Sequence, residues 1–161
     1  MLKKIFSLGL IFILLLTAVS CTRTPNIPNT EKIIASLCEN EKALPAGRIY
    51  SSDLVATDKG FLSDSLLISY FGEPNVKKYK ENWLSYSIFI SSGRPECEFA
   101  VIYCSTPSSL TDTSRLLSLR LDSIKKSFAE ADGRVITRGG YAILIISRDI
   151  KDQIKLIRKV C

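Results

Sequence analysis

Hydrophobic positions divide the chain into an opening apolar run and a longer segment with helical or alternating periodicity. Residues 5–19 are almost uniformly apolar and follow the basic pair Lys3-Lys4. Small residues come next, an order typical of a secretory signal peptide. The run is shorter than the roughly 20 residues that a membrane-spanning helix needs. We therefore predict that residues 1–20 form a signal peptide, and we leave them out of the fold.

Two helices are predicted early in the remaining chain. The first begins at Thr30, which can cap it, and runs to about Glu41. Its apolar side chains recur at helical spacing, namely Ile33, Ile34, Leu37 and Cys38. A shorter helix starts at the capping residue Ser63 and ends at Gly72 and Pro74. Its core-facing side chains are Leu66, Leu67, Tyr70 and Phe71.

Two β-hairpins follow, after a segment at residues 77–81 that we expect to be a solvated connector. In the first hairpin, apolar residues alternate with mostly polar ones at Leu84, Tyr86, Ile88 and Ile90, the period of a half-buried strand. Its partner strand is residues 98–104. The second hairpin joins residues 134–138 to 141–147 through Gly139-Gly140, which tolerate the positive φ angles of a two-residue turn. Both faces of residues 141–146 are apolar, which predicts a central strand.

A long helix separates the hairpins, and a last helix ends the chain. The long helix runs from Pro107 to about Ala131, with an apolar face formed by Leu110, Leu117, Leu121, Ile124 and Phe128. The last helix is capped by Asp149 and repeats Ile150, Ile154, Ile157 and Val160. Residues 30–161 are therefore predicted to form a single α+β domain. Its centre would be a mostly antiparallel four-stranded sheet, made of two β-hairpins separated by the long helix, with helices packed on it.

The residues around Cys21 predict a lipid anchor. Ala18-Val19-Ser20-Cys21 resembles the lipobox of bacterial lipoproteins, in which the cysteine thiol is acylated before the peptide is cut, although Leu is usual at the position of Ala18. Ordinary secretory cleavage and an uncleaved anchor stay open as alternatives. We predict membrane lipid attached through Cys21, a flexible tether at residues 21–29, and a location at the extracytoplasmic face of the cell membrane.

The charge of the exported chain is mildly basic. Without Lys3 and Lys4, 20 of the 22 basic residues remain against 16 acidic ones, a net charge of +4. This balance suits a location beside anionic lipid head groups or wall polymers. Nucleic acid is not an expected partner, because the chain is exported and its charges are not concentrated on one element.

Histidine is absent, which excludes Ser-His-Asp and Cys-His nucleophiles and removes the commonest zinc ligand. A Ser-Lys arrangement at residues 123–126 has no supporting motif. We therefore predict no catalytic residues, no cofactor and no metal ligands. One alternative stays open for Glu96 and Glu98, which stand two residues apart and should project on the same side of a strand. Paired carboxylates can serve acid–base chemistry. More often they are charges at a sheet edge that discourage aggregation between strands.

Four cysteines follow Cys21, an even number that permits two disulfides in three connectivities. They are Cys38, Cys97, Cys104 and Cys161. Cys97 and Cys104 are separated by an odd number of residues along one strand, so they would lie on opposite faces and cannot pair. Cys38 lies on an apolar stripe and could equally be a buried thiol. Disulfides and free thiols both remain open.

A candidate contact surface lies at the second hairpin. Arg138 opposes Tyr141 across the two-residue turn, and Arg134 falls on the same side at the far end. An arginine over an aromatic ring is suited to an anion or a glycan. The same three residues would also fit a packing pair near a turn, so they are a candidate site and not an assigned one.

The lipobox and the hairpin sequences resemble a known family. The shared stretches are Tyr86–Gly93, Glu98–Ile102, the segment Arg120-Leu121-Asp122 of the long helix, and Gly140–Ile146 before the final amphipathic helix. Together they resemble small uncharacterised lipoproteins of clostridia-like Gram-positive bacteria that share a domain of unknown function. The resemblance implies a bacterial cell surface and an α+β domain. It carries no established activity or site residues.

The favoured hypothesis for function is a non-enzymatic, membrane-anchored module that binds an envelope protein or polymer. One alternative is a cell-envelope hydrolase or wall-modifying enzyme that uses carboxylates such as Glu96 and Glu98. Another is a self-associating structural surface protein, which an exposed apolar sheet face would suggest.

Overall fold

The computed structural model describes residues 29–93 and 96–161. Its centre is a five-stranded sheet with the order β1-β2-β3-β5-β4, in which every neighbouring pair is antiparallel. The strands are β1 (Gly47–Ser51), β2 (Trp83–Ser91), β3 (Glu98–Cys104), β4 (Gly133–Arg138) and β5 (Tyr141–Ile146). The helices are α2 (Thr30–Asn40), α3 (Asp64–Phe71), α4 (Glu73–Tyr79), α5 (Pro107–Ser127) and α6 (Ile150–Val160), with a short 3-10 helix at Lys80–Asn82.

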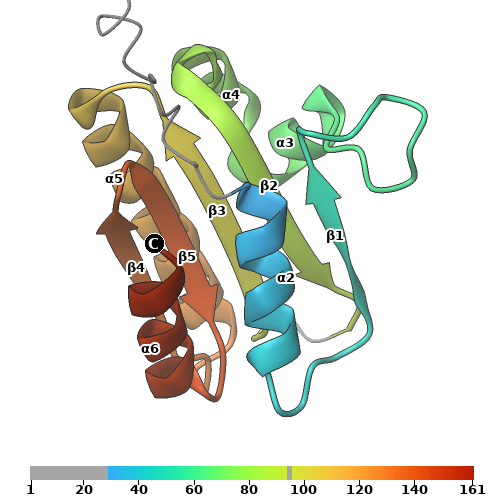
Figure 1. The fold of residues 1–161 in the computed structure, drawn as a ribbon, viewed down its shortest axis with the longest axis vertical. Coiled ribbons are helices and arrows are strands. Elements are labelled where there is room, and N and C mark those ends of the chain that lie inside the picture. Colours follow the sequence, from blue (N-terminus) through green and yellow to red (C-terminus); the bar gives the residue numbers. More distant parts are fainter. Residues whose placement is uncertain (1–28, 94–95) are drawn as a thin grey trace, which may run out of the picture.

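Helices cover both faces of the sheet (Figure 1). Alternate residues of β5 show the division: Ala142, Leu144 and Ile146 join the core beneath α3, α4 and α5. Tyr141, Ile143 and Ile145 join a second core beneath α2 and α6. All six residues of β5 are buried, and β5 lies between β3 and β4, as its uniformly apolar sequence predicts.

The predicted α+β class, both hairpins and the long helix are confirmed, but the sheet has five strands and not four. The additional strand is β1, which pairs with β2 from Gly47 opposite Ser91 to Ser51 opposite Ser87. It lies at the sheet edge and is only partly buried, so its five residues lack a clear alternation. A Cβ atom at Gly47 would lie 2.6 Å from both the carbonyl oxygen of Ile90 and the ring of Phe89. Glycine therefore allows the close approach of β1 to β2.

The segment predicted as a solvated connector, residues 77–81, is exposed at Lys77, Lys78 and Glu81 but is helical and not an irregular connector. These residues belong to α4 and to the 3-10 helix that follows it. Gly72 adopts a φ of 84° between α3 and α4, so the chain turns sharply and begins a new helix. Pro74 lies in the first turn of α4, where its missing amide hydrogen costs nothing, and Val76 anchors the helix in the core.

Local details of the helix ends also differ from the sequence prediction. Asn29, and not Thr30, caps α2, because its side-chain oxygen accepts a hydrogen bond of 2.7 Å from the amide of Glu31. Thr30 is fully buried, and its hydroxyl lies 2.7 Å from that of Ser85 and 2.8 Å from that of Ser87. Asp149 precedes α6 without a side-chain capping bond.

Two apolar residues expected in the core lie outside it. Leu84 is 61% exposed, because the pairing of β2 with β3 is irregular between Trp83 and Ser85. Phe128 is 42% exposed and follows the last residue of α5. The strand itself is covered on both faces from Tyr86 to Phe89, and is not half-buried as its alternation indicated.

Candidate functional site: a basic groove between β4 and α6

The candidate residues of the second hairpin lie on an edge strand. Among the described residues β4 pairs only with β5, in the register Arg138 opposite Tyr141 and Arg134 opposite Ile145. Gly139 and Gly140 have φ angles of 57° and 88°, so they form the tight two-residue turn that was predicted. Because Tyr141 and Ile145 face α2 and α6, the side chains of Arg134 and Arg138 lie on that same face.

A groove of about 290 Å³ runs between β4 and α6. We call it the basic groove, and its lining residues are Arg134, Val135, Ile136, Thr137, Arg138, Ile154, Ile157 and Arg158. Three of these side chains are arginines and none is acidic. Ile136, Ile154 and Ile157 form an apolar floor: Ile157 belongs to the α2/α6 core, Ile136 packs against it, and Ile154 is half-buried.

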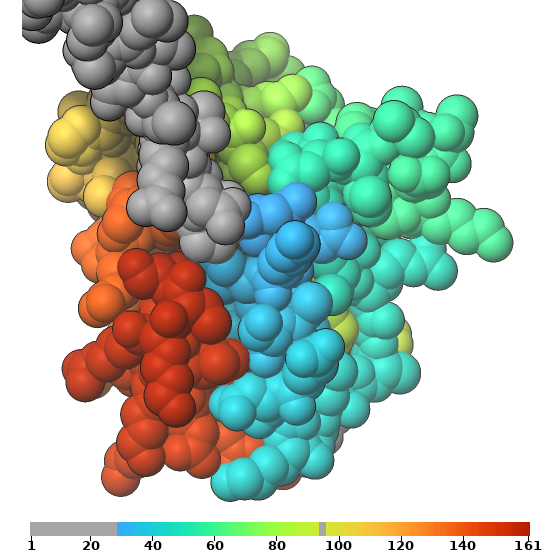
Figure 2. Space-filling model, viewed as in Figure 1, coloured from blue at the N-terminus to red at the C-terminus, as the bar shows by residue number. Residues whose placement is uncertain are grey.

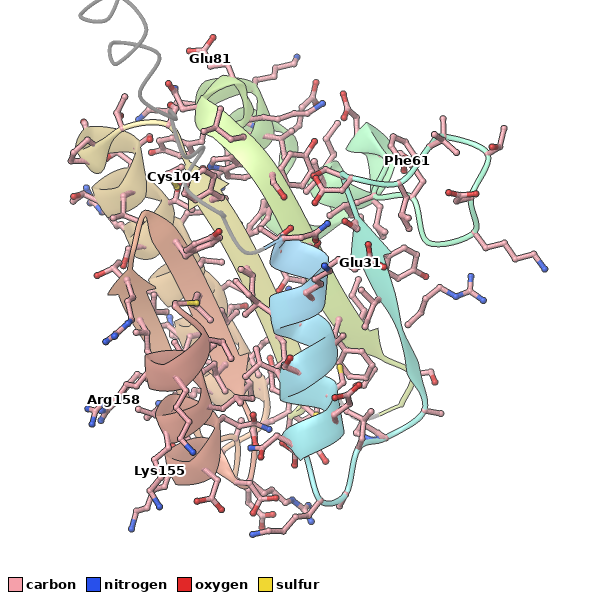
Figure 3. The ribbon with its side chains drawn as sticks, in the orientation of Figure 1. Glu31, Phe61, Glu81, Cys104, Lys155 and Arg158 are labelled. Atoms are coloured by element: carbon pink, nitrogen blue, oxygen red, sulfur yellow. The ribbon has the colours of Figure 1, made fainter. Side chains whose placement is uncertain are left out.

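The three arginines of the basic groove are exposed. None of them takes part in an ion pair with another residue of the described segments. Figure 2 shows the atoms of α6 beside those of β4 at one margin of the molecule, and Figure 3 shows Arg158 extending outward from α6 on the β4 side. Their charges are therefore available to an anion that approaches this margin.

Tyr141 is not part of this surface, and the expectation that it offers its ring to a ligand is wrong. Its side chain is 2% exposed, and its ring centroid lies 4.7 Å from that of Tyr103. Burial raises the pKa of Tyr141 well above its ordinary value, and the nearby Cys161 and Tyr103 raise it further. The sequence placed Arg138 opposite Tyr141 correctly, but it did not show that α6 covers the ring.

Sequence reasoning missed the contribution of α6 to the site. Arg158 follows Ile154 by four positions, so the helical period brings both to one side of α6. That period was visible in the sequence. The position of α6 beside β4 was not, because it depends on how the last helix packs across the sheet.

Glu98, one of the two carboxylates considered for catalysis, is buried and fully engaged. Its side chain accepts bonds from Arg120, at 3.2 Å from Nε and 2.8 Å from Nη2, and from the hydroxyl of Tyr70 at 2.5 Å. The Arg120 guanidinium also lies over the Tyr70 ring, 4.5 Å from its centroid. Burial, together with the charge of Glu98, raises the pKa of Tyr70 well above its usual value.

Glu96 lies apart from that cluster, in the turn before β3. Its carboxylate is 3.9 Å from the guanidinium of Arg148, and it lines a depression of about 260 Å³ beyond the end of α5. Glu98 does not line that depression. The two carboxylates are therefore held by different arginines, and the structure does not bring them to one pocket.

A second buried carboxylate, that of Glu41, joins α2 to α6. Its Oε2 atom accepts a hydrogen bond of 2.5 Å from Ser147 and one of 3.1 Å from the amide of Gln153. The same Gln153 amide donates to the carbonyl oxygen of Leu37 at 3.1 Å. Glu41 is 8% exposed, so neutral donors replace much of its hydration.

No disulfide links Cys38, Cys97, Cys104 and Cys161 in the structure. Burial raises the pKa of Cys38 to about 12, with smaller effects from Cys97, Glu41 and Glu39. Burial also raises the pKa of Cys104, whose thiol lies 3.5 Å from the hydroxyl of Thr113. Such thiols are poor nucleophiles at neutral pH.

The predicted signal peptide, Cys21 and nearly all of the tether lie outside the described residues. Within residues 29–93 and 96–161, no helix has the length and apolar content needed to cross a bilayer. No family model, curated protein or solved structure matches this chain. The resemblance to small bacterial lipoproteins therefore stays a prediction.

Proposed function

We propose that this protein is a non-enzymatic, lipid-anchored module that binds an anionic protein or polymer of the bacterial cell envelope. The observation that carries the proposal is the basic groove, in which three exposed arginines surround an apolar floor beside an edge strand. Charged groups around an apolar centre provide both attraction and a contact area that excludes water.

The anchor part of the proposal rests on the amino-terminal sequence. A signal peptide at residues 1–20 and acylation of Cys21 would place the domain on the extracytoplasmic face of the membrane. The segment from Cys21 to Asn29 can span at most roughly 30 Å when fully extended. The basic groove would then remain within reach of the polymers and proteins next to the bilayer.

The engagement of the carboxylates supports a binding role over a hydrolytic one. A general acid or base needs to meet a substrate, whereas Glu98 is 3% exposed and already accepts bonds from Arg120 and Tyr70. This arrangement is typical of an ion pair that joins a strand to two helices. Glu96 is accompanied by the cation of Arg148 in a separate depression.

Cell-surface cross-linking tests the binding role. A photo-cross-linking residue at Thr137, an exposed position in the basic groove, should capture one specific partner when Cys21 is present and lose it in Cys21→Ala. Replacing Arg134, Arg138 and Arg158 by Gln should abolish capture. The matched control replaces Arg115, Lys125 and Lys126, exposed on α5 across the sheet, by Gln. Equal loss in both triple variants would show that net charge, and not the groove, attracts the partner.

Metabolic labelling with a fatty acid tests the anchor separately. The wild-type protein should incorporate label, and Cys21→Ala should not. An unlabelled mature protein that begins elsewhere than Cys21 would reject the lipid anchor while leaving the binding role of the domain open to the cross-linking experiment.

A further inference from the structure

The exposed edge of β4 is a template for another strand. β4 has β5 on one side, and no other strand of the described residues pairs with it on the other. Figure 1 shows β4 at the left margin of the sheet, with no further strand beside it and with α6 in front of the lower part of the β4–β5 hairpin. An edge strand of this kind presents main-chain groups that another extended chain can pair with.

The register identifies which groups point outward. Arg138 and Tyr141 close a two-residue turn, so they form a hydrogen-bonded pair, and the pairs then alternate along the ladder. Ile136 and Arg134 therefore bond to β5. The amide and carbonyl groups of Val135 and Thr137 point away from the sheet, toward the open edge.

The side chains beside those outward groups form a regular series. Arg134, Ile136 and Arg138 occupy alternate positions on the α6 side of β4, so the two arginines stand about 13 Å apart along the strand. In an added antiparallel strand, the residues opposite these three would be non-hydrogen-bonded pairs, in which side chains approach most closely. Arg134 and Arg138 would therefore favour acidic residues at the two ends of the added segment, and Ile136 would favour an apolar residue between them.

We propose that the basic groove binds an extended acidic peptide segment of a partner protein, which adds to β4 as a sixth, antiparallel strand. The segment would carry two acidic residues four positions apart with an apolar residue midway, facing Arg138, Ile136 and Arg134. Main-chain bonds to Val135 and Thr137 supply sequence-independent attraction, and the alternate side chains supply selectivity. Arg158 of α6 lines the same groove and adds to the attraction for the acidic residues. This inference rests on the proposed binding function.

A second copy of the chain is a less suitable occupant. Antiparallel pairing of two β4 strands centred on Ile136 would place Arg134 of each copy opposite Arg138 of the other. Like charges directly opposite each other destabilise a strand pair. A phosphate polymer would satisfy the arginines, but it offers no N–H groups to the outward carbonyl oxygens of Val135 and Thr137.

The test uses the full-length protein in phosphatidylcholine vesicles and a fluorescent peptide with the pattern Glu-Thr-Val-Thr-Glu. Fluorescence anisotropy should show saturable binding, weakened about tenfold by Arg134→Gln or Arg138→Gln. A peptide with the same composition and adjacent glutamates should bind at least about tenfold more weakly, because its charges fall on opposite sides of the strand.

Two matched controls separate strand addition from attraction between charges. N-methylation of the two threonines of the peptide removes the N–H groups that would bond to β4 and leaves every charge in place. In the protein, Thr137→Pro removes one outward N–H that β5 does not use, whereas Thr137→Val keeps it. Both the methylated peptide and the proline variant should reduce affinity at least about tenfold, and Thr137→Val should not. Far-ultraviolet circular dichroism checks that the proline variant is folded.

The outcomes distinguish this inference from the function on which it rests. Strand addition would be overturned if the methylated peptide bound as tightly as the unmodified one and inorganic polyphosphate bound equally well. If the arginine variants then bound neither ligand, the protein would be a module that binds anions by charge alone. Absence of peptide binding would also overturn it, and the cross-linking experiment at Thr137 would then decide the proposed function by itself. Sedimentation of the protein as dimers that Thr137→Pro dissociates would assign the edge to self-association.

Discussion

Each face of the sheet holds one buried carboxylate, and the two faces stabilise theirs in different ways. Glu98, on the side of α3 and α5, is balanced by the positive charge of Arg120 and by the hydroxyl of Tyr70. Glu41, on the side of α2 and α6, accepts its bonds from the neutral groups of Ser147 and Gln153.

The difference shows what each carboxylate does for the fold. The Glu98 ion pair connects β3 to α5, the helix that follows it, and loss of one partner would leave an uncompensated charge in the core. The Glu41 cluster joins the end of α2 to the start of α6, where removal of one neutral donor leaves the others in place. A buried carboxylate need not be catalytic. Here Glu98 joins β3 to α3 and α5, and Glu41 joins the end of α2 to α6.

The largest expected effect comes from removing the cation beside Glu98. Arg120→Met should lower the free energy of unfolding by about 3 kcal/mol, because Glu98 would remain buried without its partner. Urea denaturation at pH 7 measures the change. The double variant Glu98→Gln, Arg120→Met should recover part of the loss, since no buried charge is left. If Arg120→Met were as stable as the wild type, the ion pair between Glu98 and Arg120 would not stabilise the packing of α5 on the sheet.

A smaller loss is expected on the other face. Gln153→Leu removes the donor to both Glu41 and the carbonyl oxygen of Leu37, and should cost about 1–2 kcal/mol in the same denaturation experiment. Ser147→Ala removes one bond to the carboxylate and the acceptor of the Asp149 amide, and should cost less because Gln153 still donates to Glu41. A loss for Gln153→Leu as large as that for Arg120→Met would contradict the distinction between charged and neutral partners.

Alkaline pH should lower the free energy of unfolding, because Tyr70 beside Glu98 resists ionisation in the folded state. The pKa of Tyr70 is raised in the folded state, so its contribution to stability is present below the unfolded pKa near 10 and is lost as the pH rises above it. One pH unit above that value, the loss amounts to about 1.4 kcal/mol. Stability measured from pH 9 to 11 should therefore fall more steeply in the wild type than in Tyr70→Phe. Parallel curves would show that Tyr70 ionises equally in both states.

The smallest expected effect is on the reactivity of Cys38 when the charge of Glu41 is removed. Burial is the main reason that the pKa of Cys38 is raised to about 12, and Glu41 contributes to the increase. Glu41→Gln should therefore speed alkylation of Cys38 by iodoacetamide at pH 8 by a few-fold, followed by mass spectrometry. Cys104 is the internal control, because burial raises its pKa without a contribution from Glu41. Equal acceleration at both cysteines would indicate general loosening of the fold.

The sequence predicted the elements with strong periodicity and missed those that depend on neighbours. Both hairpins, α5 and the buried strand β5 follow from their apolar spacing. β1 is short and partly exposed, so its formation depends on β2 being present to pair with it. The candidate site shows the same limit. Arg134 and Arg138 followed from the hairpin register, whereas the burial of Tyr141 and the participation of Arg158 depend on where α6 packs.

Under the proposed anchor at Cys21, the buried hydroxyl of Thr30 would have a mechanical consequence for the domain. Any pull exerted along the chain enters the domain at the first turn of α2, where Thr30 is bonded to Ser85 and Ser87 of β2. Ser87 is bonded in turn to Ser51 of β1, 2.9 Å away. Tension on that anchor would therefore reach β2 and β1 through these hydroxyl bonds as well as the first turn of α2.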